Sequence, residues 1–555
     1  MVKGTGKNWW TWGGLALGAA AAAGYGLRRY LGDAQNYLRD YQGATFVRRE
    51  CWPTHARVRL YNGRIVDVAH GRYLSPDVEI LLHEGQIVAM PGLRGEPADG
   101  AADFSVDLQG RAVIPGLFNA HCHVQMINPA LPSNLQGMPG ALLRRNLFRD
   151  WQLAHTMAEC AARGITTVRD ALTEDLRQLY HLRDAICLGR MPGPRLEQSV
   201  LVSPAGGSFA PQDRGLMDRL MWRTITLPQI PYGKEYSGMV LFAADAGPQE
   251  VRDAVDRAID ERGAQNIKIY DQRTRRLTAD RPAVFMTLEQ LDTLVERARA
   301  RGVPTQMHHI AAESLRRAAQ VGVVSLEHLP GDRLLTDEEV QMLLAAETVL
   351  IPTLSIVYTS VWPIQGHSLA DHPAMQQLSA YRRRTGNSLD REYWIPQLRE
   401  EAAATYTAPE PRQPNPFMEA MAKGMAALLI VWGENLRRLY AAGVPIGCGN
   451  DAGATPSTPA MVREELGMLG FALNEASARL RFGGADALRA ATLHSARAMG
   501  IEDRLGSIEP GKVADLVLLD GDPLQDAQLI GSRAAAVWRE GQLVVDNCGL
   551  CPQPT

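Results

Sequence analysis

Short apolar segments alternate with helix-like stretches along the central part of this 555-residue chain. The helix-like stretches include residues 288–301 and 311–320, and glycines such as Gly302, Gly322 and Gly443 mark the turns between elements. Strands that alternate with helices are typical of parallel βαβ units. The apolar segments lie near residues 112–120, 165–169, 197–202, 265–270, 303–308, 323–328, 348–354 and 443–450. The sequence therefore predicts an α/β fold, a (β/α)8 TIM-like barrel whose chemistry gathers at the C-terminal ends of the strands.

Two histidines close the first apolar segment, with one residue between them. In a β-strand alternate side chains share a face, so His121 and His123 project together while Cys122 points away. Two imidazoles at this spacing can bind one metal ion. The pair also occurs as ordinary strand polarity, so by itself it leaves both interpretations open.

Further polar residues lie at the ends of later segments, or within them. His308, His328 and Asp451 each close one segment, and Lys268 lies inside residues 266–270. An ammonium group on an apolar strand costs free energy unless it is paired or modified. A lysine of lowered pKa in a metal site can be carboxylated by CO2, and the resulting carbamate can bridge two cations. The alternative is a lysine at the barrel rim that extends its amine into solvent.

The motifs PGLFNAHCHV, GITTVRD, NIKIY, QMHH, SLEH and GCGNDAG resemble those of the amidohydrolase superfamily, in its prolidase-like and imidazolonepropionase-like branch. The resemblance extends from about residue 55 to about residue 545. It implies that His121 and His123 bind a first metal ion and that His308 and His328 bind a second. Lys268 would bridge them as N6-carboxylysine, and Asp451 would contact the first metal and carry protons. Nitrogen and oxygen ligands fit zinc best, although other divalent metals use them too.

This resemblance implies a metal-dependent hydrolase in which a hydroxide shared by two cations attacks a carbonyl, while Asp451 acts as general acid and base. The expected substrate is a small amide or peptide-like compound with a carboxylate, such as a dipeptide or an N-acyl amino acid. Alternatives are a cyclic amide or imidazolone hydrolase, a deaminase or a lactonase. A mononuclear deaminase would not normally need Lys268. A scaffold without catalysis is a further alternative, which retention of the whole ligand set disfavours.

Two long insertions, residues 206–238 and 356–433, are predicted to extend from the catalytic face. We expect them to select the substrate. Ser208 stands where many relatives carry a histidine after two glycines. Arg382 and Trp394 in the second insertion, and Tyr270 beside Lys268, are further candidate substrate contacts, because a positive charge and aromatic area suit an apolar carboxylate. The same insertions could instead form a contact between subunits.

Strand-like pieces outside the barrel predict a composite β-sandwich made from residues 55–111 and 506–547, with the barrel at residues 112–505. Residues 1–30 differ in kind, because residues 9–27 carry no charge and follow Lys3 and Lys7. As a helix they would span roughly 28 Å, close to the thickness of a bilayer's hydrocarbon core. We expect either a membrane anchor or a cleaved signal segment that exports the protein.

The net charge of the chain and its resemblance to the amidohydrolase superfamily indicate which partners to expect. The net charge is −3, and no basic stripe indicates nucleic acid as a ligand. A small-molecule substrate is expected, and relatives commonly form homo-oligomers.

Overall fold

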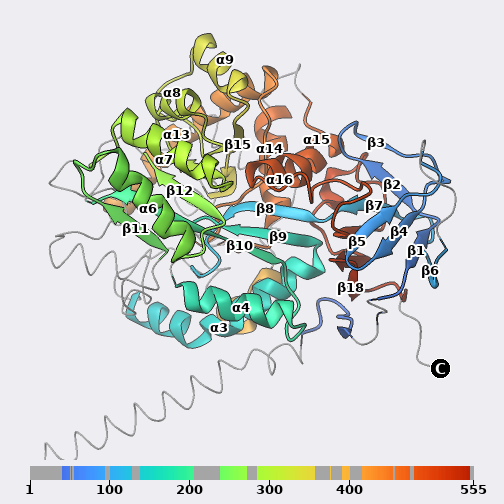
Figure 1. The fold of residues 1–555 in the computed structure, drawn as a ribbon. Coiled ribbons are helices and arrows are strands. Elements are labelled where there is room, and N and C mark those ends of the chain that lie inside the picture. Colours follow the sequence, from blue (N-terminus) through green and yellow to red (C-terminus); the bar gives the residue numbers. More distant parts are fainter. Residues whose placement is uncertain are drawn as a thin grey trace, which may run out of the picture.

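The structure is a computed structural model that describes residues 41–550, except for 50–51, 53–54, 94–100, 128–137, 174, 206–237, 272–283, 357–375, 377–390, 400–415, 454–456 and 475–480. A ring of parallel strands surrounded by helices lies beside a smaller pair of sheets (Figure 1). No helix in the described part of the chain is long and apolar enough to cross a membrane. The predicted membrane or signal segment at residues 9–27 lies outside the described residues.

The barrel wall contains parallel strands in the order β8, β9, β10, β12, β13, β14 and β15. Their side chains are mostly buried on both faces, as in sheets covered by helices. This nearly closed ring confirms the predicted TIM-like barrel. The strands are β8 (Leu117–Cys122), β9 (Ile165–Asp170), β10 (Arg195–Pro204), β12 (Asn266–Tyr270), β13 (Thr305–His308), β14 (Ser325–Glu327) and β15 (Val349–Ile351).

Local sequence signals set the boundaries of the surrounding helices. At the start of α7 (Leu288–Ala300), the Thr287 side chain accepts from the backbone N–H of Gln290, and the Gln290 side chain accepts from that of Thr287. At the end of α8 (Ala312–Val321), Gly322 takes the left-handed conformation that ends many helices. The other long helices are α3 (Met138–Ala162), α4 (Leu176–Cys187), α6 (Pro248–Asp260), α9 (Asp337–Ala345), α13 (Pro416–Ala441) and α14 (Val462–Asn474).

The eighth predicted strand, residues 443–450, is not a regular strand. It makes one isolated parallel bridge, between Leu350 and Ile446. Pro445 has no N–H group to donate, so a continuous ladder cannot form there. The segment still closes the ring, because Gly447 donates to the carbonyl oxygen of Leu350 on β15 and Ala120 on β8 donates to that of Cys448, both at 2.8 Å.

One strand was not predicted. β11 (Met239–Phe242) pairs in parallel with the C-terminal half of β10. It has only four residues and directly follows the predicted insertion at residues 206–238. So short an apolar run, next to an insertion, was not recognised as a strand. The long β10 therefore contacts three neighbours in turn: β9, then β12, then β11.

The apolar run predicted as the first barrel strand, residues 112–120, is divided between two sheets. β7 (Ala112–Pro115) pairs with β16 (Leu516–Leu519) in the smaller body, and β8 belongs to the barrel. Gly116 separates them, and a Cβ atom there would overlap the side chain of Thr166. The chain therefore passes from one body to the other at Gly116 rather than before residue 112.

The smaller body is a sandwich of two sheets with strands from both ends of the described chain. Its four-stranded sheet has the order β5 (Gln86–Ala89), β4 (Ile80–His83), β1 (Val58–Tyr61) and β6 (Phe104–Asp107). The six-stranded sheet has the order β18 (Gln542–Asp546), β17 (Ala536–Arg539), β16, β7, β2 (Arg64–Asp67) and β3 (Arg72–Tyr73). Leu60, Ile80, Leu516 and Trp538 share the apolar core between them.

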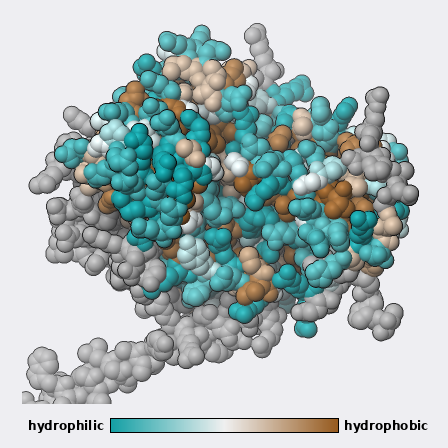
Figure 2. Space-filling view, in the orientation of Figure 1, coloured by the Kyte–Doolittle hydropathy of each residue, from teal (hydrophilic) through white to brown (hydrophobic). Residues whose placement is uncertain are grey.

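Part of the predicted insertion at residues 356–433 is packed on the barrel. The side chain of Gln152 on α3 donates to the carbonyl oxygen of Tyr393 and accepts from the N–H of Ile395. The exposed surface of the described residues is mostly hydrophilic on the face drawn in Figure 2, with apolar side chains in small separate groups. The large apolar groups are therefore mainly in the cores of the two bodies.

Candidate metal centre

The structure brings together all six residues that the sequence predicts as metal ligands. They come from five segments of the barrel wall and lie in or just after its strands, on the side where the C-terminal ends meet. His121 is in β8 and His123 follows it, Lys268 is in β12, His308 ends β13, His328 follows β14, and Asp451 follows the closing segment 444–450.

Asp451 lies between the two histidines of β8. Its Oδ1 atom is 3.4 Å from Nε2 of His121 and 3.2 Å from Nε2 of His123. One ligand atom from each of these three residues lies within 4.8 Å of the other two. Two imidazole nitrogens and a carboxylate oxygen form a ligand set that zinc accepts. The three residues could therefore hold a metal ion.

The second pair of histidines adjoins this cluster. The rings of His308 and His328 are 4.5 Å apart between centroids, and those of His121 and His328 are 5.2 Å apart. Oδ2 of Asp451 is 3.9 Å from Nε2 of His328. Asp451 thus faces the β8 histidines with one oxygen and His328 with the other.

Lys268 is buried among these groups, with 4% of its surface exposed. Its positive charge acts on His123, His308 and His328. Burial lowers the pKa of its amine to about 8, although the charges of Glu327 and Asp451 oppose this shift. The alternative of a rim lysine that reaches solvent is therefore wrong.

The protonation of His328 follows from its neighbours. Nδ1 of His328 lies 2.6 Å from the hydroxyl oxygen of Thr353, and that hydroxyl donates to the carbonyl oxygen of Pro352 at 2.8 Å. The hydroxyl oxygen therefore accepts from Nδ1–H, which leaves the lone pair of Nε2 directed at Asp451. The backbone φ angles of His328, Thr353 and Asp451 are +76°, +51° and +47°. Such strain is found mainly where the surrounding structure enforces it, as at functional sites.

The electrostatics of the cluster suit a bound cation. Burial lowers the pKa of His308 and lowers that of His328 to about 3, so both rings are neutral, as metal ligands must be. Burial also opposes ionisation of Asp451, but its contacts with the imidazoles of His121 and His123 outweigh it and hold its pKa well below the ordinary range. An anionic carboxylate and neutral imidazoles are the forms that bind a divalent metal.

Two buried atoms near His123 lack a hydrogen-bond partner within the described part of the chain. They are Nδ1 of His123 and Oδ2 of Asp170. The charges of the two side chains act on each other, and burial raises the pKa of Asp170 to about 7. A histidine that binds a metal through Nε2 usually donates Nδ1–H to a carboxylate or carbonyl group. In this structure no hydrogen bond joins Nδ1 of His123 to Asp170, although the charges of the two groups interact.

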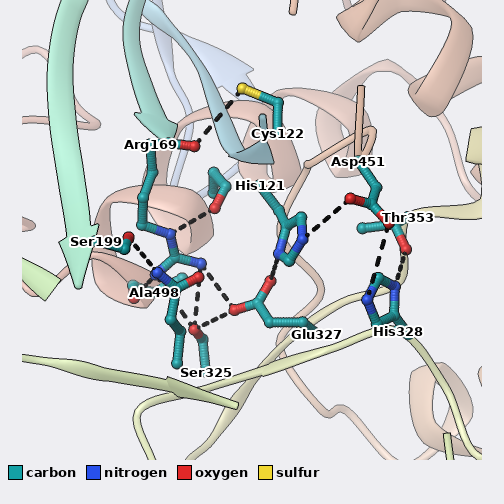
Figure 3. Close-up of polar contacts among 12 residues, drawn as sticks. His121, Cys122, Arg169, Ser199, Ser325, Glu327, His328, Thr353, Asp451 and Ala498 are labelled. Carbon is teal, nitrogen blue, oxygen red and sulfur yellow. Dashed lines mark hydrogen bonds and ion pairs between the residues drawn. The ribbon is translucent and has the colours of Figure 1, made fainter. Parts of the chain in front are cut away.

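The sequence analysis missed a second layer of polar residues. Glu327 contacts Nδ1 of His121, and Arg169 contacts Glu327, both from the interior of the barrel (Figure 3). Thr353, behind His328, was missed as well. Like Lys268, Arg169 and Glu327 are charged residues within apolar strands, and that signal could have identified them.

Of the predicted substrate contacts, Tyr270 is at the site. Its ring stacks on His308, with centroids 4.2 Å apart and planes 9° apart. Trp394 is instead buried in the apolar core beside Tyr393 and Ile395. The aromatic ring that stacks on His328 belongs to Trp432 of α13, at 6.2 Å between centroids. Ser208 and Arg382 lie outside the described residues.

Comparison with known proteins identifies relatives of this architecture. Two protein-family models, both described as amidohydrolase family, match the chain. One matches residues 112–361 and the other residues 362–545. Over 128 residues the chain is 32% identical to an imidazolonepropionase of Shouchella clausii, which covers 22% of this chain and 27% of the relative. It is also 32% identical over 119 residues to a 5-methylthioadenosine/S-adenosylhomocysteine deaminase of Teredinibacter turnerae, covering 20% of this chain and 27% of the relative. The chain thus matches about a quarter of the length of these curated relatives.

A solved structure extends the likeness over the whole fold. A Xaa-Pro dipeptidase with bound methionine in the active site superposes with a TM-score of 0.57 at 21% identity, over 88% of this chain and 100% of that chain. At this level of identity, the likeness shows a shared fold.

Proposed function

This chain belongs to the amidohydrolase family, and we propose that it hydrolyses C–N bonds. The proposed substrate is a small amide or peptide that bears a carboxylate, such as a dipeptide or an N-acyl amino acid. The convergence of the six predicted ligands carries this proposal, because amide hydrolysis needs a strongly activated water. We further propose that His121, His123 and Asp451 hold one divalent ion, His308 and His328 a second, and that both ions are zinc. Two such ions would supply an activated water and polarise the substrate carbonyl.

Lys268 is proposed to serve as an N6-carboxylysine between the two halves of the cluster. The ammonium group would first lose a proton, and the resulting amine nitrogen would bond to the carbon of CO2 and lose a second proton to solvent. The two steps together convert a cation into an anion. The burial that lowers its pKa also increases the uncharged fraction that can react. The anion would offset the positive charge that two metal ions bring into the buried cluster.

Asp451 is proposed to move the proton that amide cleavage requires. Its two oxygens face the β8 histidines and His328, so it lies beside the proposed position of water and substrate. It would accept a proton from the attacking water and deliver it to the leaving nitrogen, which is a poor leaving group unless protonated. Tyr270, stacked on His308, would contact the substrate, and Ser208 and Arg382 remain proposed contacts.

A substrate panel tests the proposed activity. Metal-loaded protein is incubated with N-acyl amino acids, dipeptides and their C-terminal amides, and released amine is quantified. We expect hydrolysis of the free acids and a KM at least tenfold higher for the amides, because the carboxylate is replaced by a neutral group. Tyr270→Phe, which keeps the stacked ring and removes the hydroxyl, should raise KM without changing metal content. Fully metal-loaded protein that hydrolyses no member of the panel would contradict the proposal.

A second candidate activity is hydrolysis of a cyclic amide, as the similarity to an imidazolonepropionase suggests. Imidazolones, lactones and purine nucleosides in the same panel test this activity, lactonase activity and deamination. Fewer than one metal ion per chain after expression with excess metal would instead favour a catalytically inactive scaffold or a single-metal enzyme.

Cellular location and assembly are also part of the proposal. Residues 9–27 would attach the protein to a membrane or direct its export, and the enzyme would act as a homo-oligomer. Peptide mapping of protein from the membrane fraction tests the first point: recovery of residues 1–27 excludes cleavage. Light scattering of purified protein tests the second.

A further inference from the structure

Arg169 and Glu327 form an ion pair inside the barrel. Both side chains have no exposed surface, and Nη2 of Arg169 donates to Oε1 of Glu327 at 2.8 Å. Charges at such a depth are costly unless every donor and acceptor has a partner. The guanidinium meets this condition: it also donates to the carbonyl oxygens of Ala120 and Ala498, to Oδ1 of Asn266 and to the hydroxyl of Ser325.

The Glu327 carboxylate connects this pair to His121. Oε1 accepts from Arg169 and from the hydroxyl of Ser325, and Oε2 contacts Nδ1 of His121 (Figure 3). An ionised carboxylate only accepts, so Nδ1 of His121 carries the proton. The lone pair of Nε2 then points toward Asp451, 3.4 Å away. The carboxylate thus determines which ring nitrogen of His121 is available to a metal.

Arg169 holds His121 at a second point. Its Nε donates to the carbonyl oxygen of Ala120 at 2.6 Å, which is in the peptide group directly before His121. One guanidinium therefore positions both the backbone of His121 and, through Glu327, its ring. An arginine keeps its charge at all relevant pH values, so Glu327 stays an anion whatever the occupancy of the site.

We propose that Arg169 and Glu327 are positioning residues that orient His121 and increase its affinity for the first metal ion. The inference rests on the metal-binding part of the proposed function. A carboxylate behind a ligating histidine raises the basicity of the ring and fixes its direction, and removal of such a partner typically weakens metal binding by about 10- to 100-fold. A buried ion pair that served only the fold would affect stability alone.

The chain offers a matched control for this distinction. Glu159 on α3 is 1% exposed and is paired with Arg163 and Arg533, both at 3.0 Å. It is a buried glutamate in an arginine network, but its partners are not among the six predicted ligands. E159Q and E327Q therefore remove the same charge from similar surroundings.

The experiment measures Zn²⁺ binding without substrate. Metal-stripped wild type, E327Q and E159Q compete for Zn²⁺ with a coloured chelator, and thermal unfolding is recorded for each. We expect E327Q to bind the first equivalent about 10- to 100-fold more weakly, and E159Q to stay within about twofold of wild type while losing thermal stability. In ¹⁵N spectra of histidine-labelled protein, E327Q should lose the Nδ1–H signal of His121.

Other outcomes are equally decisive. Wild-type Zn²⁺ affinity in folded E327Q overturns the proposal, as does an equal loss of affinity in E159Q. If E327Q does not fold, S325A provides the test, because it removes only the hydroxyl that bonds Glu327 and Arg169. We expect S325A to bind Zn²⁺ severalfold more weakly than wild type. An unchanged Zn²⁺ affinity overturns the proposal. A wild-type chain that binds no Zn²⁺ overturns the proposed function itself, whereas tight binding without hydrolysis contradicts only the proposed activity.

Discussion

The backbone N–H of Asp451 donates to the carbonyl oxygen of His121 at 2.8 Å. The side chains of the same two residues approach to 3.4 Å between Oδ1 and Nε2. The contact that joins the last segment of the barrel to the first strand therefore also forms one side of the candidate metal centre. The same pairing of segments therefore closes the ring and brings these ligands together.

A methyl group at residue 449 should disturb both the closure of the ring and the candidate metal centre. A Cβ atom in Gly449→Ala would lie 2.7 Å from the backbone nitrogen of His121 and 2.7 Å from a methyl group of Ile351, so the segment must move away from β8. We expect a loss of about 1–3 kcal/mol in the free energy of unfolding and weaker Zn²⁺ binding. Urea unfolding and chelator competition measure the two effects. Gly470→Ala in α14 is the control: its Cβ meets only atoms at 3.9 Å, and it should stabilise the protein by about 0.5–1 kcal/mol.

Asp451→Asn separates metal binding from proton transfer. The amide keeps an oxygen that can face the histidines, but it cannot accept a proton at neutral pH. We expect metal content near that of wild type and a loss of about 10²- to 10⁴-fold in kcat. Elemental analysis and steady-state kinetics on the same preparation provide the readouts. A metal-loaded Asn variant with wild-type turnover would remove Asp451 from the proton-transfer role.

Carboxylation of Lys268 should depend on its low pKa. With a pKa of about 8, roughly a tenth of the amine is uncharged at pH 7, compared with about one part in three thousand for an ordinary lysine. At a fixed CO2 concentration, reactivation of metal-stripped enzyme should therefore be faster at pH 8 than at pH 6. Protein reloaded with ¹³C-labelled bicarbonate should show a carbamate carbon signal that Lys268→Met lacks. An active, fully loaded enzyme without this signal would exclude the modification.

Glu465 should make stability depend on pH. Its carboxylate is buried at the start of α14 and accepts from the N–H groups of Leu354 and Ser355, both at 2.8 Å. Burial raises its pKa from 4.5 to about 7, so the folded state binds the proton more tightly than the unfolded state. The stability that this proton contributes is complete below pH 4.5 and is lost as the pH rises through 7.

The variant Glu465→Gln cannot titrate at this position. The stability of wild type relative to the variant should therefore fall by about 3 kcal/mol between pH 4.5 and pH 8. Urea unfolding of both proteins across this range measures the difference. A difference that stays constant with pH would show that Glu465 is ionised throughout.

Local patterns were sufficient for the barrel and for its six candidate ligands. A strand places alternate residues on one face, and parallel strands bring their C-terminal ends to one edge, so His121, His123 and Lys268 could be assigned from spacing and position. These rules involve only neighbours along the chain. They failed where the local signal was weak, as at the four-residue β11 and at the irregular segment that contains Pro445.

What the sequence by itself determined is the kind of fold and which side chains reach its catalytic face. Only the tertiary structure decided which groups stand behind them: Glu327 contacts a histidine 206 residues away, and Arg169 contacts Glu327 across 158 residues. These contacts depend on the register between strands and on the diameter of the ring, which no local pattern encodes. A charge buried in the barrel interior needs a partner, and here that partner is distant in the sequence. It can be identified only from the closed ring.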